Sequence, residues 1–269
     1  MSDSGPNPAD STGQRTSRDV LGSLIDSALH EMNRERSGLL LSGLSAGLDI
    51  GFGPLMMAVV LTLSEGGFGD LSTELLLASV YSIGFMFVIL GRSELFTEHT
   101  TLAVIPVLDG QASIRQLARL WGLVYVGNVV GGLLFTLLVV LLMPGLGVVS
   151  PGAFETIALK LVDHDLGWLF VGGVFAGWLM GLLAWLITAA QETTSRLLLV
   201  FIVTGTIGLL HLPHSIAGNV EVLFGLFMSP AVSLVDYLAF LSLATVGNAF
   251  GGAVFVALLK YGHVVRGGN

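Results

Sequence analysis

The chain has 269 residues, of which 53% are hydrophobic and only 11% are charged, and its formal net charge is −8. Soluble domains carry roughly 25% charged residues, so this composition predicts a membrane protein and excludes a water-soluble globule. The sequence has no cysteine, which excludes disulfides and thiol chemistry, and the acidic balance without a Lys/Arg run excludes a nucleic-acid partner.

Two segments precede the hydrophobic part of the chain. Residues 1–18 are rich in Ser, Pro, Gly and Asp without apolar periodicity, which predicts a disordered tail and no signal peptide. In residues 19–36 apolar side chains recur at steps of three and four, which predicts an amphipathic helix on the cytoplasmic side. Its apolar face has two expected partners, the membrane surface or the protein itself.

Residues 37–262 hold six hydrophobic blocks and form the predicted transmembrane domain, which a short tail follows at 263–269. Four blocks have the length of one crossing, which takes about 20 residues; they are 38–63, 120–143, 167–190 and 237–259. The other two are too long for one straight crossing and too short for two, and each has polar residues in its middle; they are 75–108 and 197–228. We therefore expect the second and fifth helices to be broken at the membrane midplane, where irregular backbone must be buried or must line a cavity.

The basic residues predict the orientation of these helices. Of the 11 Lys and Arg residues, only Lys160 falls on the side opposite the termini, and Arg92 falls inside a block. By the positive-inside rule, this pattern predicts a multi-pass protein of the cytoplasmic (inner) membrane with both termini in the cytoplasm.

An internal repeat relates the two halves. Val126-Gly127-Asn128, Gly131-Gly132 and Phe135 recur 120 residues later as Val246-Gly247-Asn248, Gly251-Gly252 and Phe255. Because the copies are three crossings apart, we expect two inverted three-helix repeats in an all-α integral membrane protein. The same offset pairs Glu94 with His214, so the two helix breaks should face each other across a pseudo-twofold axis.

These residues resemble the formate/nitrite transporter family. Residues 91–97, which end in Glu-Leu-Phe-Thr, resemble the break in that family's second helix, and 214–219 resemble the fifth-helix break with its central histidine. The repeated Gly-Asn and Gly-Gly pairs are similar to the third and sixth helices, so the resemblance covers about residues 38–261. It implies an aquaporin-like six-helix fold, a homopentamer in the lipid bilayer with one pore per subunit, and passage of small monovalent anions such as formate or nitrite, often with a proton.

The resemblance also implies roles for single residues. His214 would be the central pore histidine, and Thr97 would bind it or the substrate by a hydrogen bond. Tyr81, Phe85 and Ile207 would form apolar constrictions on either side.

Some positions differ from the family pattern. Gly177 stands where an asparagine is usual, Ile207 replaces an aromatic, and Pro213 replaces a glutamate next to the histidine. Lys160 lies one residue out of register with a lysine that attracts anions on the outer side. We include Gly177 and Lys160 in the predicted substrate pathway.

Physical chemistry favours a histidine in such a pathway even without the family. A bare anion in an apolar passage loses several kcal/mol of hydration free energy. A histidine, whose unperturbed pKa is about 6.5, can offset this loss by donating a hydrogen bond or a proton. On this hypothesis His214 either protonates the anion or stabilises it electrostatically.

Further polar residues in the blocks have two interpretations. Arg92, Glu94, Glu98 and His99 either contact substrate or form an internal ion-pair network that holds the broken helix, and we favour the network. Asp49 either pairs with Arg92 or faces a cavity. We assign the support of the breaks also to His211, Asn219, Glu221, Asn128 and Asn248.

Other functions remain as alternatives. A neutral small-solute channel would share the inverted halves, but it usually has paired Asn-Pro-Ala motifs, which this sequence lacks. A non-transporting sensor or scaffold on the same fold is the second alternative. The sequence has no HExxH or GxSxG motif, so we expect no enzyme activity, metal site or cofactor.

Overall fold

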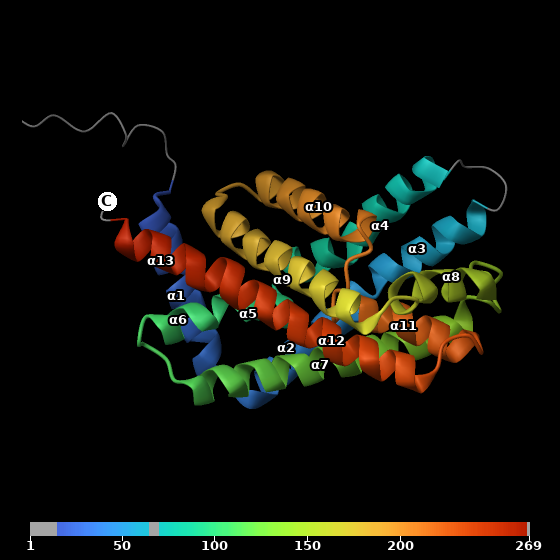
Figure 1. Cartoon of the computed structure of the whole chain (residues 1–269), viewed down its shortest axis with the longest axis horizontal. Coiled ribbons are helices and arrows are strands. Elements are labelled where there is room, and N and C mark those ends of the chain that lie inside the picture. The colour runs from blue at the N-terminus through green and yellow to red at the C-terminus, as the bar shows by residue number, and fades with distance from the viewer. Residues whose placement is uncertain (1–14, 65–69, 268–269) are drawn as a thin grey trace, which may run out of the picture.

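The computed structural model describes residues 15–64 and 70–267, and within these ranges every regular element is a helix. Figure 1 shows an elongated bundle in which α1 and α13 lie at one end and α8 and α11 at the other. Most of the predicted disordered tail, residues 1–14, lies outside the described residues.

The first half of the chain forms seven of the described helices. They are α1 (Ser17–Asn33), α2 (Arg36–Ile50), α3 (Phe52–Leu63), α4 (Asp70–Gly91), α5 (Phe96–Leu102), α6 (Val104–Leu108) and α7 (Ile114–Leu142). The second half continues with α8 (Pro151–Val162), α9 (Leu166–Ala189), α10 (Thr193–Leu209), α11 (Ala217–Met228), α12 (Leu234–Phe250), the π-helix η2 (Gly251–Leu258) and α13 (Leu259–Arg266).

Five helical stretches of the described chain are long and apolar enough to cross a membrane. They are Arg36–Leu63, Leu71–Gly91, Ile114–Leu142, Leu166–Ala189 and Leu234–Arg266. The predicted fifth crossing consists of two shorter apolar helices, α10 and α11, so the count of six crossings stays a prediction. Large apolar side chains such as Leu141 and Val235 are 75% and 74% exposed, as expected for surfaces that lipid or another subunit covers.

The repeat is visible where α7 and α12 begin. Ser113 and Ser233 stand 120 residues apart and each caps its helix by accepting a hydrogen bond from the backbone N–H three residues later. In each case the side chain at that third position, Gln116 or Asp236, bonds back to the cap. Such a reciprocal capping box satisfies backbone donors that a helix start leaves free.

Small residues let the repeated helices approach closely. An added Cβ at Gly47 on α2 would lie 2.2 Å from the backbone oxygen of Asn128, and one at Gly177 on α9 would lie 2.1 Å from that of Asn248. The two glycines therefore occupy equivalent places in the two repeats. Gly177, which we expected in the substrate pathway, packs against the backbone of Asn248, and its place in the pathway stays a prediction.

We predict that Gly177→Ala destabilises the protein, because α9 and α12 must separate to admit the methyl group. Overpacking of this kind costs about 1–3 kcal/mol or more. The matched control is Gly122→Ala on α7, where nothing lies within 4 Å of the added Cβ and helix propensity favours alanine. Thermal unfolding in detergent should show a lower midpoint for the first variant only, and equal midpoints would contradict this packing.

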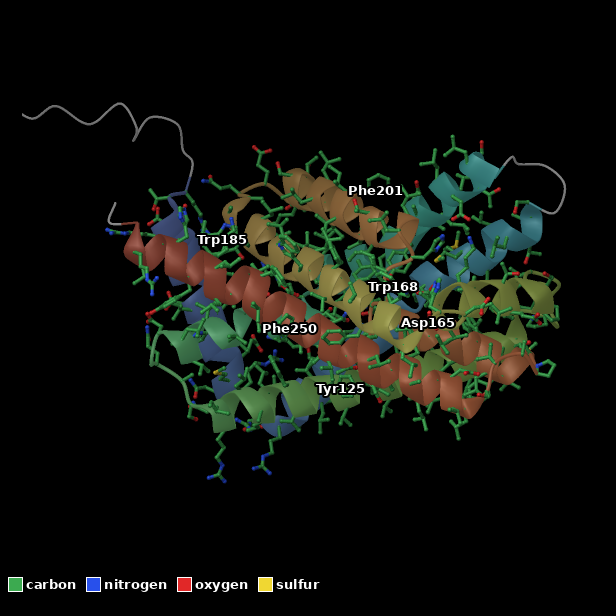
Figure 2. The ribbon with its side chains drawn as sticks, in the orientation of Figure 1. Tyr125, Asp165, Trp168, Trp185, Phe201 and Phe250 are labelled. Atoms are coloured by element: carbon green, nitrogen blue, oxygen red, sulfur yellow. The ribbon has the colours of Figure 1, made fainter. Side chains whose placement is uncertain are left out.

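The amphipathic helix packs on the protein itself. The apolar face of α1 is buried against side chains of α5, α6, α9 and α13; its members are Val20, Leu21, Leu24, Ile25, Ala28 and Met32. Figure 2 labels Trp185, which belongs to this cluster near the end of α9. Of the two expected partners for the apolar face of this helix, the structure shows the protein itself.

Candidate functional site

Two interruptions of the helices build the centre of the molecule. The chain leaves α4 after Gly91 and re-enters a helix at Phe96, and it leaves α10 after Leu209 and re-enters a helix at Ala217. Each interruption contains, at or near its start, a residue in the left-handed region, Arg92 at φ 57° and His211 at φ 48°, and no other non-glycine residue of the described chain has a positive φ. Because this conformation costs an L-residue about 1–2 kcal/mol, the strain is built into both halves.

One asparagine holds each interruption in place. Asn128 accepts a hydrogen bond from the backbone N–H of Phe96 at 2.8 Å and donates to the carbonyls of Glu94 at 2.9 Å and Gly43 at 2.8 Å. The N–H of Phe96, at the start of α5, and the carbonyl of Glu94, in the interruption, have no helical partner, so the amide satisfies groups that would otherwise be unpaired and ties them to Gly43 on α2.

Asn248 repeats this pattern in the second half. It accepts from the N–H of Ser215 at 2.8 Å and donates to the carbonyls of Pro213 at 2.9 Å and Gly173 at 2.8 Å. Phe96 and Ser215 stand 119 residues apart, one fewer than the offset between the asparagines. The structure therefore pairs Glu94 with Pro213 and not with His214, which corrects the pairing expected from the sequence.

His214 is fully buried and its hydrogen bonds define its tautomer. Its Nδ1 accepts from the backbone N–H groups of Ile216 at 3.3 Å and Ala217 at 3.1 Å, at the start of α11. Nδ1 therefore carries no proton, and Nε2 bears the hydrogen that it donates to Thr97 Oγ1 at 2.9 Å. Thr97 is also fully buried, so this pair joins the two interruptions.

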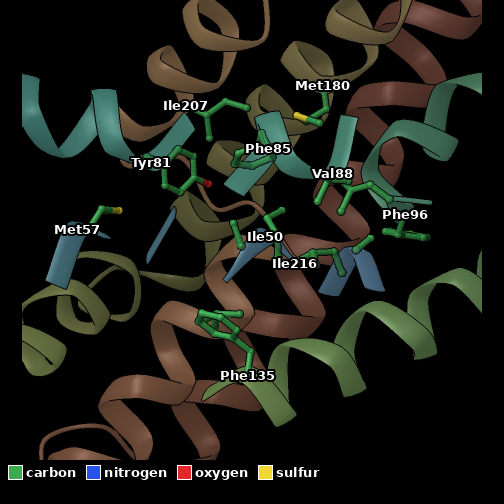
Figure 3. Close-up of a cluster of buried hydrophobic side chains, with 14 of the residues drawn as sticks. Ile50, Met57, Tyr81, Phe85, Val88, Phe96, Phe135, Met180, Ile207 and Ile216 are labelled. Atoms are coloured by element: carbon green, nitrogen blue, oxygen red, sulfur yellow. The ribbon is translucent and has the colours of Figure 1, made fainter. Parts of the chain in front are cut away.

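Apolar rings lie against this pair. The ring of Phe85 stands perpendicular to the imidazole of His214 with 5.0 Å between centroids, and the ring of Tyr81 lies 5.2 Å from that of Phe85. Figure 3 shows Tyr81 and Phe85 on one helix and Ile207 facing them from α10. The structure thus brings together the five residues assigned to the centre of the pathway.

A charged cluster lies beyond these rings, toward α8. Lys160 Nζ donates to Glu74 Oε1 at 2.8 Å, and His211 Nε2 lies 3.0 Å from Glu74 Oε2. Lys160 and His211 line one cavity of about 560 Å³, which we call the α8-side cavity. Glu74 escaped the sequence analysis because it directly precedes the second hydrophobic block.

A much smaller cavity of about 10 Å³ lies between this cluster and the rings, and Tyr81, Ile207, His211 and Glu221 are among its lining residues. Such a volume holds about one water molecule. His211 therefore borders both cavities.

On the α1 side, Glu94 contacts His99 and accepts a hydrogen bond from Arg34 at 2.8 Å. The predicted ion-pair network exists, but within the described ranges it contains Arg34 and lacks Arg92, for which no ion pair is found. Arg34 also binds Glu31 at 2.6 Å. Burial raises the pKa of Glu31, and the hydrogen bond from Arg34 opposes that rise.

The remaining predicted polar residues lie in three places. Asp49 bonds to Ser45 at 3.2 Å and does not pair with Arg92. Asn219 accepts a hydrogen bond from the Tyr237 hydroxyl at 2.9 Å, as a supporting residue would. Glu98 lines a cavity of about 230 Å³ toward α1, together with Arg92, Glu94 and His99.

Arg92 and Glu98 also line a larger adjoining cavity of about 620 Å³, to which Arg15 and Arg196 contribute. Cavities thus approach the His214–Thr97 pair from both ends of the molecule, and buried apolar side chains close the centre.

Comparisons with known proteins agree with this architecture. The family model for formate/nitrite transporters matches residues 18–262. The inner membrane protein YfdC of Escherichia coli (strain K12) is 29% identical over 237 residues, which cover 87% of this chain and 74% of that protein.

Solved structures share the fold. A channel described as an FNT family ion channel aligns with a TM-score of 0.81 at 23% identity, covering 91% of this chain and 98% of its own. A pentameric formate channel with formate bound aligns with a TM-score of 0.72 at 22% identity, covering 86% and 98%. Together with the family model, which matches nearly the whole chain, these comparisons lead to one conclusion: the chain belongs to the formate/nitrite transporter family.

Proposed function

We propose that this protein moves small monovalent anions of weak acids, such as formate and nitrite, across the membrane together with protons. The observation that carries the proposal is the buried hydrogen bond between His214 Nε2 and Thr97 Oγ1, set against the rings of Tyr81 and Phe85. Family membership supports transport and not enzyme activity.

The geometry supports an electrostatic role for His214. An anion between apolar rings lacks several kcal/mol of hydration, which hydrogen-bond donors can offset. The Nε2–H of His214 and the hydroxyl of Thr97 are two such donors at one point, and they can bind an oxygen of the anion or of its conjugate acid. Because Nδ1 already accepts two backbone N–H groups, this arrangement favours stabilisation of the anion over its protonation by His214.

We further propose an inner-membrane location with both termini in the cytoplasm, as the basic residues predict. In this orientation α1 covers the cytoplasmic end of a transport domain at 37–262, and the helix interruptions lie at the membrane midplane. Lys160 and Glu74 then lie toward the outer side of the membrane. A pentamer like the formate channel would leave one pathway in each subunit, since all residues of the centre come from one chain.

Uptake into proteoliposomes tests this proposal. We expect formate or nitrite to enter faster than into protein-free liposomes, and faster at external pH 5 than at pH 8 because the acid supplies the accompanying proton. The panel should include hydrosulfide, lactate, water and glycerol. Passage of only the neutral solutes would support the channel alternative, and binding of anions without flux would support the sensor; either result overturns the proposal.

A further inference from the structure

Glu221 is a buried acid with no partner for its charge. It lies on α11, seven residues after His214, and is 5% exposed, and within the described ranges no hydrogen bond or ion pair engages its carboxyl group. We expected Glu221 to support the helix break, but no polar contact of its carboxyl group within the described residues connects it to the break. An unpaired acid in an apolar interior is costly, so its retention points to a function.

The carboxyl group of Glu221 has access to one small polar space. The cavity of about 10 Å³ that it lines is shared with Tyr81, Ile207 and His211 and has room for about one water molecule. That cavity adjoins the constriction formed by Tyr81 and Ile207. Glu221 therefore stands beside the narrow part of the pathway and not at the lipid-facing surface.

His211 links this buried space to the surface. It lies 3.0 Å from Glu74 and 3.5 Å from Lys160, and it lines the α8-side cavity as well as the small one. Its left-handed backbone at φ 48° would suit glycine better, so the imidazole side chain is retained against local strain. Glu74 and His211 are thus in contact, and His211 and Glu221 border the same small cavity.

In this arrangement His214 is not the residue that accepts a proton from His211 and Glu74. Its Nδ1 is occupied by the N–H groups of Ile216 and Ala217, and its Nε2 already carries a proton. This arrangement leaves proton exchange with the permeating species to a group other than His214.

Building on the proposed function, we propose that Glu221 is the residue that exchanges a proton with the permeating species beside the Tyr81–Ile207 constriction, and that His211 and Glu74 connect it to solvent. The protonated carboxyl group gives its proton to the anion, so the Glu221 O–H bond breaks and an O–H bond to the substrate forms. The neutral acid passes the constriction, and the carboxylate recovers a proton through His211. The exchange is reversible and needs no other reactant.

The groups around Glu221 fit this role. Tyr81 on α4 and His211 share its cavity, and α3 has no titratable residue in its sequence. Most other titratable residues on the packed helices are engaged elsewhere: Lys160 with Glu74, Glu155 with Ser229, Tyr237 with Asn219, Tyr125 with Thr245, Asp236 with Ser233 and Arg119 with the carbonyls of Met32 and Arg34. Arg115 is exposed near the start of α7. Within the described residues, no cation neutralises Glu221 directly.

The test measures formate uptake and internal acidification in the same proteoliposomes. Glu221→Gln keeps the size of the side chain but cannot exchange a proton, so we expect the ratio of protons to formate to fall at least tenfold. Glu221→Asp should keep a measurable part of the ratio. The matched control is Glu155→Gln on α8, where the amide oxygen can still accept the hydrogen bond from Ser229, and its ratio should equal that of wild type.

An unchanged ratio in Glu221→Gln, with formate uptake intact, would overturn this inference and leave the proposed function standing. Absence of formate uptake by wild type would instead overturn the proposed function. Should Glu221→Gln fail to fold, wild-type protein offers a second readout, which is labelling by a hydrophobic carbodiimide that modifies buried protonated carboxyl groups. Labelling of Glu221 that excess formate suppresses is expected, and no labelling at acidic pH would contradict the inference.

Discussion

Replacing Asn248 with leucine is expected to destabilise the protein by several kcal/mol and to abolish its correct folding in most molecules. The substitution removes three hydrogen bonds at once: it leaves the N–H of Ser215 and the carbonyl of Pro213 buried without partners, and it breaks the link to Gly173 on α9. Each such group costs about 1–3 kcal/mol. Asn128→Leu should have a similar effect, since that amide makes the equivalent three bonds.

Thermal unfolding and size-exclusion chromatography in detergent measure this loss. Asn248→Asp should be intermediate, because a carboxylate can accept from Ser215 but cannot donate to the two carbonyls. Asn33→Leu is the control, since Asn33 is exposed on α1 and bonds only to the carbonyl of Leu29 among the described residues. If Asn248→Leu unfolded at the same temperature as that control, the asparagines would not hold the helix interruptions.

Replacing Thr97 with valine is expected to reduce the initial rate of formate uptake at least tenfold per folded protein. Valine has nearly the same shape but lacks the hydroxyl group, so the N–H of His214 loses its acceptor and the anion loses one of two donors. Losing a hydrogen bond to the charged anion raises the barrier by about 1.5–3 kcal/mol, which corresponds to about tenfold or more in rate.

Thr101→Val provides the matched control. Thr101 lies one turn further along α5 and donates to the carbonyl of Gly252 at 2.9 Å, away from His214. It should lower stability slightly and leave uptake per folded protein unchanged. Equal rates in the Thr97 and Thr101 variants would mean that the Thr97 hydroxyl has no part in passage.

The centre of the molecule was predictable because its residues are unusual for a hydrophobic sequence. Polar residues inside overlong apolar blocks marked the two interruptions, the family resemblance singled out Thr97 and His214 within them, and the repeated Gly-Asn pairs marked Asn128 and Asn248 as equivalent. Local sequence pattern carries this information, since irregular backbone in a membrane needs polar partners of this kind.

Features that depend on packing between distant segments were not predictable. Arg34 and Glu94 are 60 residues apart, and Lys160 and Glu74 are 86 apart, so no local pattern pairs them. Gly177 seemed to be a pathway residue by analogy, but its lack of a side chain serves the close approach of α9 to Asn248. The backbone groups that the two asparagines bind, at Phe96 and Ser215, are 119 residues apart, whereas the asparagines are 120 apart. The repeat in the sequence does not reveal this difference, because it depends on which backbone groups the asparagines bind.

The most direct test of the central claim is simultaneous measurement of formate uptake and internal pH in proteoliposomes containing wild type or His214→Ala, with protein-free liposomes as the blank. If anions pass at the His214–Thr97 pair, wild type should take up formate with acidification of the interior, and the variant, folded and of unchanged oligomeric size, should lose at least nine-tenths of both signals because the anion has no Nε2–H donor. Uptake by His214→Ala at the wild-type rate, with the same dependence on external pH, would contradict the account.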